Sequence, residues 1–411
     1  MKLLIITHVP HIKVNHEYFG YAPYVREMNI WLRYVDEVVV VAPLVQESLT
    51  PIHESYVTNS PFRFVKVPEF DLTSFFNQLK AFPRALVAMV KMYQAMQQAS
   101  HIHLRCPGNM GLVGAIVQIL FPYKQKTAKY AGNWDPKSKQ PWSYRLQKWI
   151  LSNTFLTRNM QVLVYGEWEG STKNIKSFFT ATYSESEIQN SEFRIQNKLS
   201  LQSESITIES DFDFAQSDKK DNNSLSLRAE SRTNENQFKF LFIGTLSPGK
   251  QPLYAIQLVE ELYKKGLRVT LELYGEGVLR KELELYIAQN KLEPIVTLKG
   301  NQSKESVLKA YQTSHFLILP SKSEGWPKVV AEAMFWGCVP IASPVSCVSY
   351  MMGNGSRGVI LQEELNQDVD QIEAVISKQE VYQKMASEGQ TWSRQFTTDK
   401  FEAEIKKLLR G

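Results

Sequence analysis

Two glutamates stand eight positions apart in residues 317–343, which read LILPSKSEGWPKVVAEAMFWGCVPIAS. Glu324 falls in a polar stretch, whereas Glu332 is the only acid between Pro327 and Pro340 and has apolar neighbours. A carboxylate in a mostly buried helix needs hydrogen-bond donors, and ligand hydroxyl groups could supply them. The alternatives are a backbone or arginine partner inside the protein for Glu332 and a solvated loop position for Glu324.

The elements around these glutamates form a predicted strand-loop-helix-strand unit. Residues 317–319 are apolar and suit a buried parallel strand. Pro327 suits the first position of a helix over residues 329–336, and Gly337 suits its end before a strand over 339–342. The amino end of such a helix offers free N–H groups, so it predicts an anion site, most often for a phosphate.

The whole unit resembles the nucleotide-sugar motif of the retaining glycosyltransferases of family four, the "group 1" enzymes with the GT-B fold. Their motif is P-S-x-x-E-G-x-x-x-x-x-x-E-A-x-x-x-G-x-P-V/I. Seven residues match in register: Pro320, Ser321, Glu324, Gly325, Glu332, Ala333 and Gly337. Pro340 and Ile341 match the end of the motif one position later.

The resemblance implies a function and a role for each site residue. It implies glycosyl transfer with retention from a nucleotide sugar, with no cofactor and no metal. No side chain stands out as a general base, and in such enzymes the leaving phosphate oxygen takes the acceptor proton. Glu324 would hold the donor sugar and Glu332 the ribose hydroxyls. The N–H groups of Gly325, Trp326 and the helix start would stabilise the diphosphate, with Ser321 on the same donor side.

A second donor-side motif opens the predicted second domain at FKFLFIGTLSPGKQP. This stretch resembles the family's G-R-L-x-x-x-K-G, in which Arg and Lys bind the donor diphosphate. Gly244 and Lys250 match, and Thr245 replaces the Arg. Lys250 is therefore expected to be catalytic together with Glu324. Its alternative is a solvated loop lysine.

The first half of the chain predicts a Rossmann-like opening, with strands at residues 2–7 and 37–42 and a helix at 24–34. In the resembled family the loop before that helix carries phosphate-binding glycines, of which Gly20 is the one present. The loop histidines are expected to be solvated. The family also implies that the segment KYAGNWDPKSKQPW lines the acceptor cleft, with Asn133, Trp134 and Asp135 as acceptor-side candidates.

Chain length predicts two domains, and the resemblance implies an α/β protein of the GT-B type, in which two Rossmann-like domains with parallel sheets face a central cleft. The 411 residues are 43% hydrophobic and 22% charged, which is typical of a globular protein. We expect a first domain over 1–190, a disordered polar insertion over 191–237 and a second domain over 238–392. The residues at 393–411 predict a C-terminal helix, and the resemblance implies that this helix returns to the first domain. The D-x-D pattern of Asp211 and Asp213 falls in the insertion and is interpreted as accidental.

Charge and cysteine usage bear on location and partners. Three cysteines without metal-ligand spacing, and an apolar start too short for a signal peptide, predict a cytoplasmic protein. Residues 72–150 are rich in basic and aromatic residues, with Asp135 as their only acid. No nucleic-acid motif is present, so an anionic membrane is the preferred partner and a solvated basic face the alternative. The candidate membrane residues are Lys80, Arg84, Lys137, Lys139, Arg145 and Lys148.

The resulting hypothesis is transfer from a UDP- or GDP-sugar to a glycan or lipid-linked acceptor, in cell-surface polysaccharide or glycoconjugate synthesis. Two alternatives remain open. A sugar-nucleotide epimerase or hydrolase can share the architecture, and it would release an epimer or free sugar. A non-catalytic nucleotide-sugar-binding partner protein is suggested by Thr245, and it would bind without turnover.

Overall fold

The computed structural model describes residues 1–50, 52–69, 75–188 and 237–410. The predicted insertion at 191–237, with Asp211 and Asp213, lies outside the described residues except for Gln237. The chain divides into two compact units. The first comprises Met1–Thr180, Glu324–Trp326 and Lys400–Gly411, and the second comprises Ala181–Ser323 and Pro327–Asp399.

The first unit is built on a mostly parallel sheet whose strands are continuous apolar runs such as Val38–Val41, because both faces are covered. Its strand order is β10-β9-β8-β7-β1-β4-β2-β3-β5, with β6 also paired to β4. The parallel strands are β1 (Lys2–Ile6), β4 (Glu37–Val45), β6 (Phe62–Val67), β7 (His101–Cys106), β8 (Gln125–Tyr130), β9 (Met160–Tyr165) and β10 (Ile175–Phe178). Its helices are α1 (Ala22–Leu32), α2 (Phe75–Gln98), α3 (Asn109–Val117), the short η1 (Gln118–Leu120), α4 (Trp142–Ser152) and α14 (Thr398–Arg410).

The prediction of one long loop after the first strand was wrong. This segment contains an antiparallel hairpin of β2 (His11–Val14) and β3 (Glu17–Tyr21). Strand β3 pairs in turn with β5 (His53–Ser55). Asn15 makes the tight turn with a φ of 54°. The solvated position expected for His11 was also wrong. Its ring is buried and bonded to Val9 O and Tyr56 OH, and burial lowers its pKa to about 4.

The second unit has a fully parallel sheet in the order β13-β12-β11-β14-β15-β16. The strands are β11 (Phe238–Ile243), β12 (Val269–Tyr274), β13 (Val296–Gly300), β14 (Phe316–Leu319), β15 (Val339–Ala342) and β16 (Val359–Ile360). The helices are α7 (Pro252–Lys264), α8 (Arg280–Gln289), α9 (Lys304–Thr313), α10 (Lys328–Phe335), α11 (Val348–Met351), the short η2 (Gly353–Gly355), α12 (Leu365–Ile376) and α13 (Gln379–Ser393). The predicted α/β class with two parallel sheets is confirmed.

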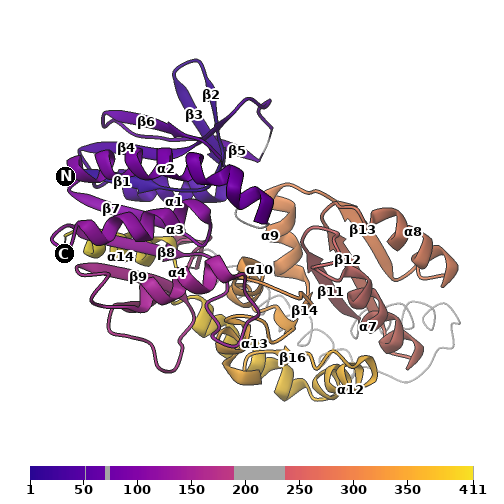
Figure 1. Cartoon of the computed structure of the whole chain (residues 1–411). Coiled ribbons are helices and arrows are strands. Elements are labelled where there is room, and N and C mark those ends of the chain that lie inside the picture. Colours follow the sequence, from indigo (N-terminus) through magenta and orange to yellow (C-terminus); the bar gives the residue numbers. More distant parts are fainter. Residues whose placement is uncertain (51, 70–74, 189–236, 411) are drawn as a thin grey trace, which may run out of the picture. The chain divides into compact units, whose positions relative to one another are not determined.

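A single C-terminal helix was predicted over residues 393–411, and the predicted start of that helix was wrong. Helix α13 ends at Ser393 and α14 begins only at Thr398, because the N–H of Thr398 is taken by Tyr183 O at 2.9 Å. Helix α14 then packs in the first unit, where it lies among elements from the start of the chain (Figure 1). Phe401 is buried there, with its ring centroid 5.5 Å from that of Phe178.

Candidate functional site

Two loops that leave the sheet of the second unit lie side by side, and each carries or leads into predicted site residues. Strands β11 and β14 are parallel neighbours, so the loops that follow them leave the same edge of the sheet. The N–H of Lys322 in one loop donates to Gly249 O in the other at 2.9 Å. The backbone beside Lys250 is therefore tied to the backbone just before Glu324. The positions of the Lys250 and Glu324 side chains relative to each other stay a prediction.

A third loop, which follows β12, packs closely against the loop after β11, and glycines make this close backbone approach possible. A Cβ at Gly275 would lie 2.0 Å from Gly244 O, and a Cβ at Gly277 would lie 2.3 Å from Leu246 O. Gly275 also has a φ of +141°, which favours glycine. The backbone of residues 274–277 (YGEG) is thus held in contact with the loop that carries Lys250.

Lys250 lies in a tight turn before α7. Its N–H donates to Ser247 O at 3.0 Å, and the next residue, Gln251, has a left-handed φ of 50°. The side chain is half-buried beside Gly244, where an added Cβ would lie 3.9 Å from Lys250 Cδ. Thr245, which stands where the family has an Arg, is exposed.

Ser321, near the start of the loop between β14 and α10, is fully buried. No described residue bonds to the Oγ of Ser321 or to that of buried Ser343, which directly follows β15. Two buried hydroxyl groups at the ends of neighbouring strands are costly unless something else bonds them. Ser343 was missed by the sequence prediction, although its place after a buried strand was a usable signal.

The amino end of α10 follows this loop. Pro327 is the N-cap residue and Lys328 is the first residue of the helix. Pro327 was predicted at the first helical position, so that prediction was wrong by one residue. No side chain in the described ranges caps this end. Its first N–H groups therefore remain suited to an anion. Glu324 and Gly325, in the loop before it, are half-buried, and Trp326 is buried.

Glu332 lies in the second turn of α10 and is bonded within the protein. The Thr182 hydroxyl donates to its Oε1 at 2.7 Å, and the Tyr311 hydroxyl donates to its Oε2 at 2.9 Å. Burial, followed by the Glu332 charge, raises the pKa of Tyr311 well above its usual value. An internal partner was an open alternative, and the partners are hydroxyl groups rather than a backbone group or an arginine. The ribose role of Glu332 stays a prediction.

The acceptor-side candidates of the first unit form a turn between β8 and α4. Asn133 Oδ1 accepts from the N–H of Asp135, and Asp135 Oδ1 accepts from the N–H of Lys137, each at 2.8 Å. Trp134 is buried against Tyr130. Lys148, expected on a membrane-facing surface, donates to the carbonyl oxygens of Trp134 and Asp135, at 2.8 and 3.1 Å. Lys148 is half-buried, and its role at a membrane stays a prediction.

A nearby pocket of about 390 Å³ collects residues that the sequence prediction missed. It lies at the carboxyl ends of β1, β4, β6 and β7, and it is lined by His8, Glu69, Asn109 and Tyr144 among others. The His8 ring lies so close to Gly108 that a Cβ there would be 3.1 Å from His8 Nδ1. Burial, and then the charge of Arg105, lower the pKa of His8. A neutral imidazole therefore faces this pocket near pH 7.

A buried ion cluster lies in the same unit. Glu27 in α1 pairs with Arg105 at 3.0 Å and with Lys129 at 2.9 Å. Burial alone would raise the pKa of Glu27, but the two cations outweigh it and lower the pKa to about 2. The cluster fixes Arg105 beside the ring of Tyr24, 5.6 Å from its centroid.

Gly20 lies in strand β3, beside Val25 and His11, so its backbone is that of a strand and not of a loop. Its donor-side role stays a prediction. No group of three or more His, Cys, Asp or Glu residues suited to a metal ion occurs in the described part of the chain.

Comparison with known proteins finds sequence similarity to glycosyltransferases over part of the chain. Residues 223–392 match the family model described as "Glycosyl transferases group 1". The chain is similar to a glycosyltransferase of Methanocaldococcus jannaschii, with 27% identity over 41% of this chain and 46% of that protein. It is also similar to the alpha-D-kanosaminyltransferase of Streptomyces kanamyceticus, with 25% identity over 36% of this chain and 38% of that protein. The matched region thus spans less than half the length of these relatives.

Solved structures extend the likeness to the whole chain. The Anabaena protein HepE in complex with UDP superposes with a TM-score of 0.62 at 16% identity, covering 100% of both chains. WaaG, a glycosyltransferase involved in lipopolysaccharide biosynthesis, superposes with a TM-score of 0.56 at 11% identity, again over 100% of both chains. At these identities the likeness shows the fold, which is the predicted GT-B type.

Proposed function

We propose that this protein is a glycosyltransferase that moves a sugar from a UDP- or GDP-sugar to a glycan or lipid-linked acceptor. The observation that carries the proposal is the bond between Lys322 N and Gly249 O, which joins the loops of the two donor-side motifs. The family model that covers residues 223–392 supports the same function. The similar structure of HepE holds UDP, and a second structure of that protein holds UDP-glucose.

In the proposed mechanism the diphosphate binds at the carboxyl edge of the second sheet. Lys250 and the N–H groups at Gly325, Trp326 and the start of α10 stabilise the negative charge that develops on the leaving diphosphate. Glu324 orients the donor sugar and Glu332 orients the ribose. The leaving phosphate oxygen accepts the acceptor proton, and the anomeric configuration is retained. The proposal requires neither a metal nor another cofactor.

The acceptor is proposed to bind in the pocket of the first unit that contains His8. The pocket offers a neutral imidazole, the Glu69 carboxylate and the Tyr144 ring, which suit hydroxyl groups and the apolar face of a sugar. Residues 133–135 are not among the residues that line this pocket. The pocket thus replaces them as our choice for direct acceptor contact.

The activity is tested by incubating the full chain with UDP- and GDP-sugars and candidate acceptors. Proton NMR of the product reports the anomeric configuration. A glycoside with the donor's configuration supports the proposal. Release of free sugar or an epimer with every acceptor would favour the hydrolase or epimerase alternative. Nucleotide binding without turnover would favour a non-catalytic partner.

We also propose that the protein associates peripherally with the inner face of an anionic membrane, where it would serve cell-surface polysaccharide or glycoconjugate synthesis. One face of α4 exposes Trp142, Arg145, Leu146 and Trp149, at the spacing of a single helical stripe. The exposed Lys137 and Lys139 precede that helix, and Arg84 is exposed on α2. Aromatic side chains flanked by cations suit an anionic interface. No described helix is long and apolar enough to cross a membrane.

The membrane proposal predicts salt-dependent flotation with vesicles that contain phosphatidylglycerol. Each basic residue near the surface contributes about 1 kcal/mol. The variant Trp142→Ala/Trp149→Ala should lose this binding, while Tyr263→Ala, an exposed aromatic in α7, should retain it. Equal binding to neutral and anionic vesicles, or binding to neither, would reject the proposal.

A further inference from the structure

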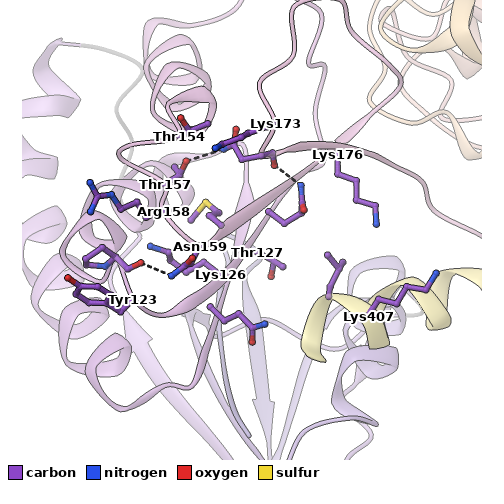
Figure 2. A pocket seen from close by; sticks show the side chains of 16 residues that line it. Tyr123, Lys126, Thr127, Thr154, Thr157, Arg158, Asn159, Lys173, Lys176 and Lys407 are labelled. Carbon is purple, nitrogen blue, oxygen red and sulfur yellow. Dashed lines mark hydrogen bonds between the residues drawn. The ribbon is translucent and has the colours of Figure 1, made fainter. Parts of the chain in front are cut away.

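A large hollow of about 740 Å³ lies in the first unit at the amino ends of β8, β9 and β10 (Figure 2). Its wall includes Lys126 and Thr127 at the start of β8, Gln161 at the start of β9, and Lys176 in β10. Helix α14 closes one side with Lys407. The hollow is therefore at the opposite end of these strands from the loops that were assigned to the acceptor.

All the charged side chains that line this hollow are positive. Sixteen residues line it, and none of them is an aspartate or a glutamate. Five carry a basic side chain: Lys126, Arg158, Lys173, Lys176 and Lys407. They come from four separate parts of the chain, which the fold brings around one cavity (Figure 2).

Part of this positive charge has a structural use. Lys126 is buried, and its ammonium donates to Phe121 O at 2.9 Å, where it satisfies a carbonyl at the end of a helical turn. Lys176 and Lys407 both pair with Glu404, at 2.6 and 2.7 Å. One carboxylate thus serves two ammonium groups, which leaves one positive charge in excess.

The remaining charge has no such use within the described residues. Arg158 and Lys173 are exposed, and neither pairs with a carboxylate in the described part of the chain. The Arg158 guanidinium lies over the Phe155 ring, 4.6 Å from its centroid, and this contact orients it while its donors stay available. Thr154 adds an exposed hydroxyl group to the same wall. Clustered cations with neutral donors suit phosphate oxygens.

We propose that this hollow, the basic end cavity, binds a ligand that carries two or more phosphate groups. The excess of cations over carboxylates calls for more than one negative charge, and the volume admits a chain of phosphates. The ligand is either a free polyphosphorylated compound or the headgroup of a phosphate-rich lipid, because both present the same oxygens. This binding is separate from glycosyl transfer and does not depend on it.

The test uses tripolyphosphate as the probe and calorimetry on the full chain. Because the diphosphate site proposed in the second unit also accepts this anion, each measurement is made with and without Lys250→Ala. The variant Arg158→Glu/Lys173→Glu should weaken the binding that survives Lys250→Ala by at least about tenfold, since attraction becomes repulsion. The matched control Lys281→Glu/Lys309→Glu changes exposed lysines of α8 and α9 and should have no effect.

The two sources of phosphate are separated by a second arm. Vesicles of phosphatidylcholine with cardiolipin should compete with tripolyphosphate if the ligand is a lipid headgroup, and should not compete if it is a free compound. Both results support the basic end cavity. The proposal is overturned if Lys250→Ala alone abolishes tripolyphosphate binding, or if Arg158→Glu/Lys173→Glu binds as the parent does. Unchanged melting of that variant shows that it is folded.

Discussion

At the scale of single residues, Glu332 already accepts hydrogen bonds from Thr182 and Tyr311. A carboxylate has about four lone-pair sites, so roughly two remain for ligand hydroxyl groups. The two protein donors hold the carboxylate in one orientation, which favours binding of a ribose in a fixed register. The motif predicted the acid at this position, but its partners come from distant segments and could not be predicted.

Glu332→Gln is expected to weaken binding of a bare nucleoside diphosphate while the fold survives. The amide keeps the shape but loses charge and presents a donor where an acceptor is needed. Loss of one charge-assisted hydrogen bond costs roughly 1.5–3 kcal/mol. Calorimetry with UDP and GDP measures the change, and Glu324→Gln is the control that should leave it unaltered. An unchanged affinity would remove the ribose assignment.

Lys250 and Glu324 should separate binding from turnover. Lys250→Ala should weaken nucleoside diphosphate and nucleotide sugar alike, because it removes a cation from the phosphates. Glu324→Ala should lower turnover by about a hundredfold or more, on the scale of losing one transition-state contact. It should leave the affinity for the bare diphosphate intact. Steady-state kinetics measures turnover and calorimetry measures diphosphate binding for both variants. Equal effects on turnover and on diphosphate binding would contradict these roles.

The buried ion cluster makes stability depend on pH. Because the folded pKa of Glu27 lies near 2, below its ordinary value of 4.5, its charge stabilises the fold above that ordinary value. This contribution, about 3 kcal/mol in scale, is lost as pH falls from 4.5 towards 2. Glu27→Gln should therefore lower the unfolding free energy at pH 7 and lower it less at pH 3. Urea unfolding at both values measures this, and an equal loss at both would contradict it.

At the scale of elements, the strand-loop-helix-strand unit around the two glutamates was predictable because its signals are local. A short apolar run, a proline and a glycine mark its boundaries. The β2–β3 hairpin was missed, although Asn15 between two alternating segments was a usable turn signal. The break before α14 could not be predicted, since it depends on Tyr183, which is far away in the sequence.

Helix α14 should be needed for the stability of the first unit. Phe401 is buried against Phe178 and Phe179, and the Lys129 ammonium lies 5.1 Å from its ring centroid. Phe401→Ala should cost about 3–5 kcal/mol, as for other buried aromatic residues. Arg410→Ala on the exposed face is the control and should change little. Thermal unfolding measures both, and identical melting of the two variants would show that α14 does not belong to this core.

At the scale of the whole molecule, the predictable part is the pair of local motifs that we propose for the donor, and the unpredictable part is everything assembled from distant segments. Each of the two motifs proposed for the donor lies within about thirty consecutive residues, so each can be recognised from the sequence alone. The His8 pocket needs the ends of four strands, and the basic end cavity needs strands of the first unit together with α14. Neither set has a spacing that sequence could reveal. Only packing brings such residues together.

The place of α14 has a consequence for how the protein is made. Its core contacts in the first unit come from residues that are synthesised only after the whole second unit. The first unit therefore cannot complete its core until the second unit has been translated, and the nascent chain carries an incomplete first core during that time. A stop codon just before Thr398 would thus disturb the half of the protein that was synthesised first.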